Sequence, residues 1–125
     1  MKYFFIAALG LSSALLSGCV AQNSLYYWGG YQDQIHTMYY SPEKAAPELQ
    51  VINLEAMMEK AKSKGKALPP GFHAHLGYEY ALSGQKDKAY EQFMLEKQQY
   101  PESTVYMDLL ISQLKPKQDK PHDQV

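Results

Sequence analysis

The stretch PGFHAHLGYEYALSGQKDKAYEQFMLEKQQYPES, residues 70–103, decides the fold of this 125-residue chain. Pro70 can open one helix, Ser83-Gly84 can separate it from a second, and Pro101 can end the second. In the first helix, one face collects residues at helical spacing: His73, Leu76, Gly77, Tyr80 and Ala81. The second helix, expected over 86–99, collects Ala89, Phe93 and Tyr100 on one side. The segment therefore predicts two helices joined by a tight turn.

This segment also resembles a tetratricopeptide repeat, a helix–turn–helix of about 34 residues. The positions that match the signature of the repeat are Leu76, Gly77, Tyr80, Ala89, Phe93 and Pro101. Gly77 and Ala89 are small enough to let the two helices cross closely, with the larger side chains around the crossing. His73 and Glu96 depart from the signature, which prefers tryptophan and alanine there, and both weaken the packing expected against a following repeat. A plain helical hairpin is the alternative.

Helical patterns flank this segment, as they must if a single repeat is to bury its faces. Residues 48–64 predict a helix that ends at a Gly65 cap. The helix starts either at Ser41-Pro42 or at Pro47. Its two apolar stripes predict packing on two sides: Leu49, Ile52 and Ala56 in one, and Val51, Leu54, Met58 and Ala61 in the other.

Two shorter helices complete the expected fold. The first has one apolar face made of Tyr31, Ile35, Met38 and Tyr39. The last, over 103–114, is expected to turn these residues inward: Tyr106, Leu109, Leu110 and Leu114. No useful length of sequence alternates with period two. We therefore predict an all-α domain over 26–114 with about five helices, followed by a disordered tail over 115–125.

The N-terminus predicts export and lipidation. Residues 1–18 combine Lys2, a short apolar run and small residues before a cut, as a signal peptide does. Leu16-Ser17-Gly18-Cys19 resembles the lipobox of bacterial lipoproteins, which implies cleavage after Gly18, acyl chains on Cys19 and a lipidated tether over 19–25. An ordinary signal peptide with a chance cysteine is the alternative. Val20, where aspartate would retain a lipoprotein in the inner membrane, favours the periplasmic face of the outer membrane.

Composition and spacing argue against catalysis and nucleic-acid binding. The formal charge is −1 and every basic residue is lysine, so no basic patch for nucleic acid is expected. His73 and His75, two apart on a helix, point in different directions, so we predict no metal site; His73 is expected near the helix crossing and His75 at the surface. Four glutamates are expected to be solvated beside lysines: Glu55, Glu59, Glu91 and Glu96. We expect no enzyme activity and no cofactor.

Aromatic residues are the best candidates for binding. Three interpretations of the cluster at Tyr26–Tyr31 are open: it completes the core, it binds a protein or peptide, or it stacks on sugars or lies at the membrane interface. The predicted partner-binding residues, which include three on the repeat, are Tyr26, Tyr27, Trp28, Tyr31, Tyr78, Tyr80 and Tyr90.

A wider resemblance covers most of residues 24–112. The runs that carry it are Tyr27–Tyr31, Ser41–Lys44, Pro69–Tyr78, Phe93–Lys97 and Tyr100–Ser103. They resemble domain-of-unknown-function family 4810, short proteins regarded as bacterial lipoproteins. The resemblance implies no enzymatic activity; it implies association with other lipoproteins, including one similar to the curli-secretion pore family. We expect a membrane-anchored adaptor that binds a protein partner; the rival is a cell-wall glycan-binding protein or small envelope enzyme that uses the Tyr/Trp cluster.

Overall fold

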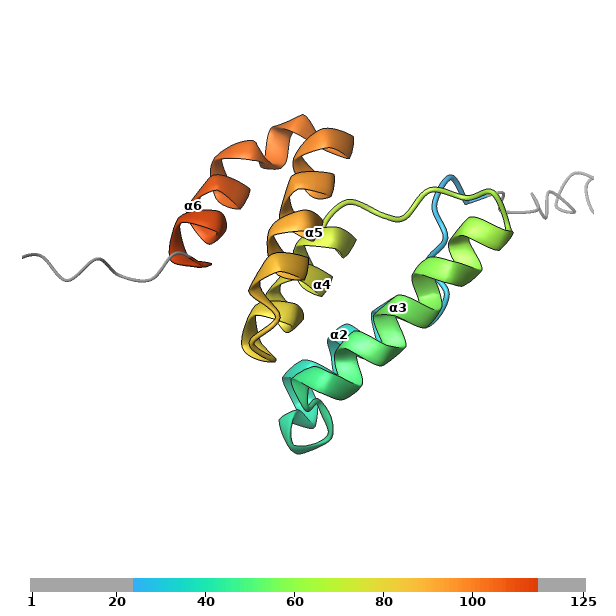
Figure 1. Cartoon of the computed structure of the whole chain (residues 1–125). Helices are drawn as coiled ribbons and strands as arrows, with labels where there is room; N and C mark the ends of the chain where they lie inside the picture. Colours follow the sequence, from blue (N-terminus) through green and yellow to red (C-terminus); the bar gives the residue numbers. More distant parts are fainter. Residues whose placement is uncertain (1–23, 115–125) are drawn as a thin grey trace, which may run out of the picture.

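The structure, a computed structural model, describes residues 24–114. The predicted signal peptide, Cys19 and the predicted tail lie outside the described residues. The elements, in chain order, are α2 (Tyr31–Tyr40), η1 (Pro42–Lys44), α3 (Pro47–Ser63), α4 (Phe72–Leu82), α5 (Lys86–Gln99), η2 (Pro101–Ser103) and α6 (Thr104–Leu114), where η marks a 3₁₀ turn (Figure 1). Residues 24–114 contain no strand beyond an isolated bridge between Tyr26 and Ala67. The predicted all-α fold with about five helices is therefore confirmed.

Helices α4 and α5 form the hairpin that the opening stretch predicts. The bounds of α5 are those expected, and α4 ends at a Schellman turn: the amide of Gln85 donates to the carbonyl of Tyr80 at 2.8 Å, and Gly84 has φ +79°. The helices cross closely at Gly77. A Cβ atom at Gly77 would lie 2.6 Å from the ring of Phe93 and 3.1 Å from the carbonyl oxygen of Ala89. The close crossing inferred from small residues is thus present.

The core lies where α3, α5 and α6 pack around α4. Its fully buried apolar side chains include Leu54, Phe72, Leu76, Phe93 and Met107. Helix α3 begins at Pro47, the second of the two predicted starts, and Pro42 opens η1 instead.

Only one of the two stripes predicted on α3 is buried. Val51, Leu54 and Ala61 face the hairpin, whereas Leu49 and Ile52 are exposed. Helix α3 does pack on two neighbours, α4 and α2, but the expectation that Leu49 and Ile52 form one of the packed faces was wrong. The sequence pattern shows that a residue is apolar but does not show whether a neighbour covers it.

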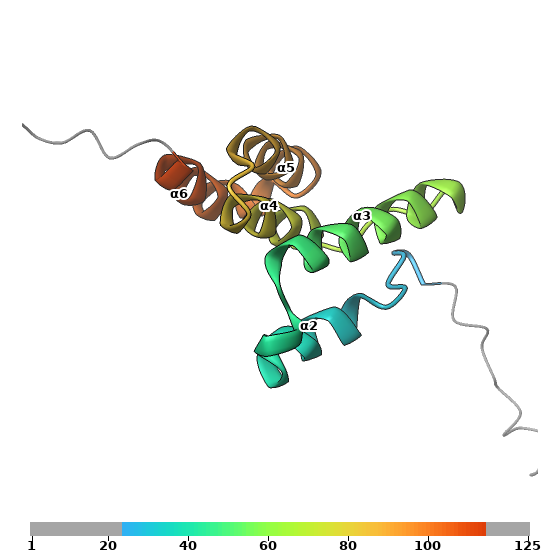
Figure 2. The ribbon, with the colours of Figure 1, turned by 60° about the horizontal axis from the view of Figure 1, so that its bottom comes forward.

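The inward faces of α2 and α6 also differ from the prediction. In α6, Tyr106 and Leu109 are exposed, and the side chains that pack inward are Met107, Leu110, Ile111 and Leu114. The faces differ because apolar residues occur on both sides of this helix, and their spacing does not show which side packs on α5. In α2, Tyr39 is exposed, since this helix packs on the core mainly through Tyr31 and Ile35 and diverges from the other helices toward its end (Figure 2).

Candidate binding groove

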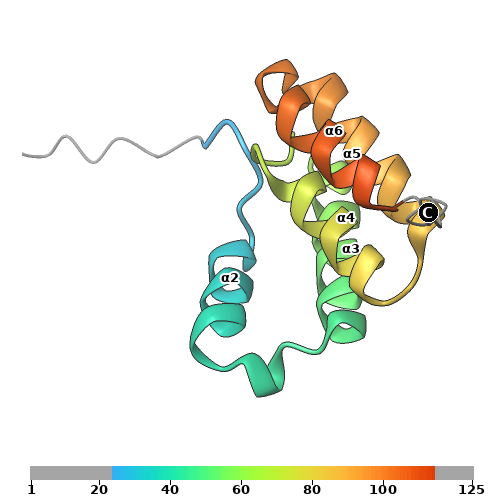
Figure 3. The same ribbon diagram turned by 90° about the vertical axis from the view of Figure 1, so that its left-hand side faces the viewer.

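An open groove lies between α2, α4 and α6. Figure 3 shows α4 between α2 and α6 on the face turned away from α3 and α5. The groove has a volume of about 610 Å³, within the range of about 300–1,000 Å³ typical of ligand sites. Its lining, mostly apolar, consists of Ile35, Met38, Tyr39, Pro42, Ala45, Ala74, His75, Tyr78, Glu79, Leu82, Tyr106 and Leu110. The exposed residues Tyr39 of α2 and Tyr106 of α6 thus form part of its walls.

Two polar side chains of α4 are buried in this lining. The side chains of His75 and Glu79 are 8% and 3% exposed, and His75 Nε2 lies 3.3 Å from Glu79 Oε1. Neither ring nitrogen of His75 has a hydrogen-bond partner among the described residues. The expectation that His75 lies at the surface was wrong, because the ring of Tyr31 packs 5.7 Å from it, between centroids. The groove therefore combines apolar walls with an incompletely satisfied polar pair.

The aromatic segment before α2 packs against the helices. The amide of Tyr27 donates to the carbonyl of Ala67 at 2.8 Å, and the ring of Tyr26 meets that of Tyr100 edge-on with centroids 6.4 Å apart. Tyr31 is buried against Phe72, with ring centroids 5.0 Å apart. These contacts support the interpretation that the segment completes the core, and they show that Tyr31 was wrongly placed among the partner-binding residues. Of this segment's aromatic residues, Trp28 is the most exposed, at 41%.

Burial changes the acidity of two of these tyrosines. Burial, with a smaller contribution from the Glu96 carboxylate, raises the pKa of Tyr31 to about 12. Burial and the neighbouring Tyr26 raise the pKa of Tyr100 to about 12, and the Tyr100 hydroxyl donates to the carbonyl of Leu68. Both phenols are therefore held in the neutral form by the folded state.

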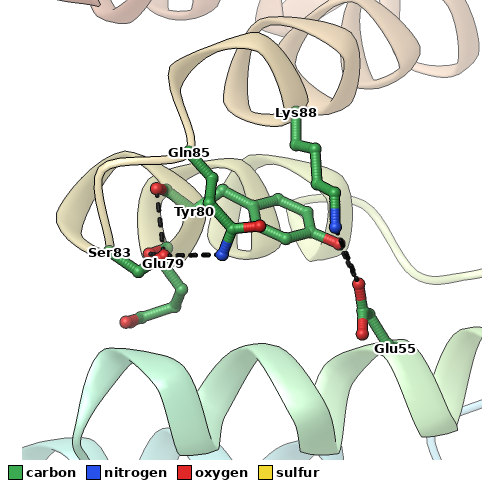
Figure 4. Close-up of polar contacts among 6 residues, drawn as sticks. All are labelled: Glu55, Glu79, Tyr80, Ser83, Gln85 and Lys88. Atoms are coloured by element: carbon green, nitrogen blue, oxygen red, sulfur yellow. Dashed lines mark hydrogen bonds and ion pairs between the residues drawn. The ribbon is translucent and has the colours of Figure 1, made fainter.

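The three tyrosines predicted on the repeat face three different directions. Tyr78 lies in the groove, and Tyr90 lies on the outer side of α5 beside Met94 and Leu95. Tyr80 is 3% exposed and its hydroxyl donates to Glu55 of α3 (Figure 4). Tyr80 is therefore a core residue and not a partner contact, and the three side chains do not share one surface.

The Tyr80 contact joins the hairpin to α3. Burial and the hydrogen bond to Glu55 raise the pKa of the Tyr80 hydroxyl. Lys88 of α5 extends over the Tyr80 ring, 5.1 Å from its centroid, and its Nζ lies 3.9 Å from Glu55 (Figure 4). The Glu55 carboxylate thus accepts a hydrogen bond from Tyr80 of α4 and pairs with Lys88 of α5.

Sequence reasoning missed the structural role of Glu96. This side chain is 2% exposed, and its two carboxylate oxygens accept hydrogen bonds from the amides of Gly71 at 2.6 Å and Ala74 at 3.3 Å. The prediction that Glu96 is solvated was wrong, because it caps the N-terminus of α4 from α5. A signal existed: the N-cap residue is Gly71, which has no side-chain acceptor, so an acceptor had to come from elsewhere.

The histidines do not gather into a metal site. His73 is buried, and its Nδ1 lies 2.7 Å from Gln92 Oε1 on α5, whereas His75 lines the groove. Across residues 24–114, no three side chains of His, Cys, Asp or Glu are placed to share an ion. The same residues also include no helix with the length and apolar character needed to cross a bilayer.

These features define a small all-helical protein with an open, mostly apolar groove between α2, α4 and α6. A family model described as Domain of unknown function (DUF4810) matches residues 25–110, and the chain belongs to that family. Neither the curated proteins nor the solved structures yielded a match. The likeness of the α4–α5 hairpin to a tetratricopeptide repeat therefore stays a prediction.

Proposed function

We propose that this protein is a lipid-anchored adaptor of the bacterial cell envelope that binds a segment of a partner protein in the groove between α2, α4 and α6. The observation that carries the proposal is the groove itself, an apolar concavity on an otherwise small domain. Ligand-binding sites are typically concave and mostly apolar with a few polar groups, and this groove has that composition. The groove holds no triad of catalytic type, and its walls suit side-chain packing.

The proposed anchor is the lipid on Cys19. Two or more acyl chains hold a protein stably on a membrane, since each buried methylene contributes about 0.8 kcal/mol. The family resemblance supports other envelope lipoproteins as partners, including one similar to the curli-secretion pore family. In cells, Cys19→Ser should leave the protein unlipidated and release it from the membrane fraction. A variant that is still processed at the same size and still sediments with membranes would refute the anchor.

Photo-crosslinking tests the groove with a matched control. Tyr78 and Tyr90 are nearly equally exposed, at 47% and 48%, but only Tyr78 lines the groove. A photoreactive amino acid at position 78, in the lipidated protein in living cells, should give a discrete protein adduct that position 90 does not give. The identity of the adduct then names the partner.

A second matched pair tests whether the adduct depends on the groove. Leu82 and Leu109 are 54% and 52% exposed, and only Leu82 lines the groove. We expect Leu82→Glu to abolish the adduct at position 78 and Leu109→Glu to preserve it. Equal adducts from positions 78 and 90, or insensitivity to Leu82→Glu, would refute the groove as the binding site. Retention on purified cell wall that depends on Trp28, without any adduct, would favour the glycan-binding rival.

A further inference from the structure

We propose that the segment received by the groove carries a lysine or arginine among apolar residues, and that its cation binds the carboxylate of Glu79. This inference rests on the proposed function, since it names the chemistry of the partner at the same site. It concerns the pair His75–Glu79, whose two side chains both line the groove.

The first argument is the state of the carboxylate. The side chain of Glu79 is 97% buried and lines the groove, where the polar side chain nearest its carboxylate is His75. His75 Nε2, at 3.3 Å from Oε1, is the one ionisable nitrogen of residues 24–114 within 4 Å, and it forms no hydrogen bond. A buried carboxylate without donors is costly, so in a folded protein it is normally paired. An occupant with a charged donor would complete this pair.

The second argument is charge complementarity. The twelve lining residues include one carboxylate and no lysine, and the chain contains no arginine. An ionised carboxylate accepts hydrogen bonds and donates none, and its strongest bonds are those to lysine or arginine. The long apolar stem of either side chain can also lie along apolar walls while its charged end reaches a carboxylate. The walls formed by Leu82, Leu110 and Ile35 suit such a stem.

The test selects the partner chemistry directly. A displayed library of amphipathic helical peptides is panned against the lipidated full-length protein in detergent micelles. Leu82→Lys is the groove-blocked bait, because it places a charge of the same sign as the predicted ligand in the apolar wall, three residues from Glu79. We expect the peptides that bind only the open groove to share a lysine or arginine at one position. A selected peptide should bind Glu79→Gln about thirtyfold more weakly, the effect typical of removing one partner of a buried charge pair.

A double-mutant cycle separates this contact from a general loss of fit. Replacing the basic residue of the peptide with methionine should weaken binding to the wild type by a similar factor and should add little to Glu79→Gln. Glu91→Gln, at an exposed glutamate of α5, is the control and should leave the affinity unchanged. Circular dichroism of Glu79→Gln checks that the helices are retained.

The outcomes distinguish the two proposals. Groove-dependent peptides without a shared basic residue, or with equal affinity for Glu79→Gln, would overturn the role of Glu79 and leave the groove as a protein-binding site. A shared neutral donor such as tryptophan or tyrosine would also overturn it. Absence of any peptide that distinguishes the wild type from Leu82→Lys would overturn the proposed function and this inference with it.

Discussion

Glu96→Gln should destabilise the fold by removing the cap that α5 provides to α4. The carboxylate accepts from the amides of Gly71 and Ala74 at 2.6 and 3.3 Å, at the end of α4 where the helix dipole favours negative charge. A glutamine keeps one oxygen but turns an NH₂ group toward the second amide. The substitution therefore loses one bond and the charge that strengthens the other.

The free energy of unfolding should fall by about 2 kcal/mol, because hydrogen bonds to charged groups contribute about 1.5–3 kcal/mol each and the longer bond is the weaker one. For a domain of this size, that corresponds to a fall in Tm of about 8–16 °C. Glu96→Ala should cost more, since it leaves both amides without an acceptor and opens a cavity in a buried site. Glu91→Gln, on the exposed side of the same helix, should stay within about 0.5 kcal/mol of the wild type.

The assay is urea unfolding followed by far-ultraviolet circular dichroism, on the chain from residue 19 with Cys19→Ser. Hydrogen exchange of the first turn of α4 gives a second readout, because loss of the cap should speed exchange there before it does so in α5. A Glu96→Gln protein as stable as the Glu91→Gln control would refute the capping role. It would mean that the cost of burying the carboxylate equals what its two hydrogen bonds contribute.

Two further predictions concern the hairpin and its tyrosines. Gly77→Ala should destabilise by about 1 kcal/mol in the same assay, because overpacking against the buried Phe93 ring costs about 2 kcal/mol and helix propensity returns about 1 kcal/mol. A stabilised variant would contradict the close crossing. Stability should fall as the pH rises from about 10 to about 12 in unfolding titrations, because the unfolded state releases the phenolic protons of Tyr31, Tyr80 and Tyr100 near their ordinary pKa of 10.0 while the folded state still holds them. The fall should be shallower in Tyr31→Phe, Tyr100→Phe protein, where Tyr80 alone of the three remains, and a flat profile in the wild type would contradict the burial of these groups.

Local sequence signals predicted the elements of this fold better than their packing. Proline and glycine positions located the ends of α3, α4 and α5, because each acts on the backbone through its own geometry. The inward face of α6 was misjudged, since apolar residues occur on both sides of this helix. Leu49 and Ile52 of α3 have the spacing of a core stripe, yet no described element lies over them.

The candidate site was only partly predictable, because it too depends on how the helices pack. Tyr78 and Tyr80 are two residues apart on one helix, and their roles differ because one faces the groove and the other faces Glu55. The groove itself depends on how far α2 diverges from α4, which is a tertiary distance that no spacing along the chain encodes. Glu96 was predicted to be solvated because glutamate is usually exposed. It is buried because the N-cap of α4 is Gly71, which has no side chain to cap that helix.

The position of Tyr26 links the proposed anchor to the groove. The ring and backbone of Tyr26 dock beside Tyr100 and Ala67, so the described fold begins seven residues after Cys19. Seven residues of chain span at most about 25 Å, which would keep a lipidated protein close to the bilayer. The groove would then meet partners held at the same membrane at a high effective concentration, and a weak site would suffice.

A flexible insertion tests this argument. About a dozen Gly-Ser residues placed between Gln22 and Asn23 should lower the adduct at position 78 with a membrane-bound partner, because effective concentration falls as the linker lengthens. The affinity of a selected soluble peptide should be unchanged, since the groove itself is untouched. If the insertion and Cys19→Ser both leave the adduct in cells at wild-type yield, the membrane does not contribute to partner binding, and the groove must bind its partner tightly on its own.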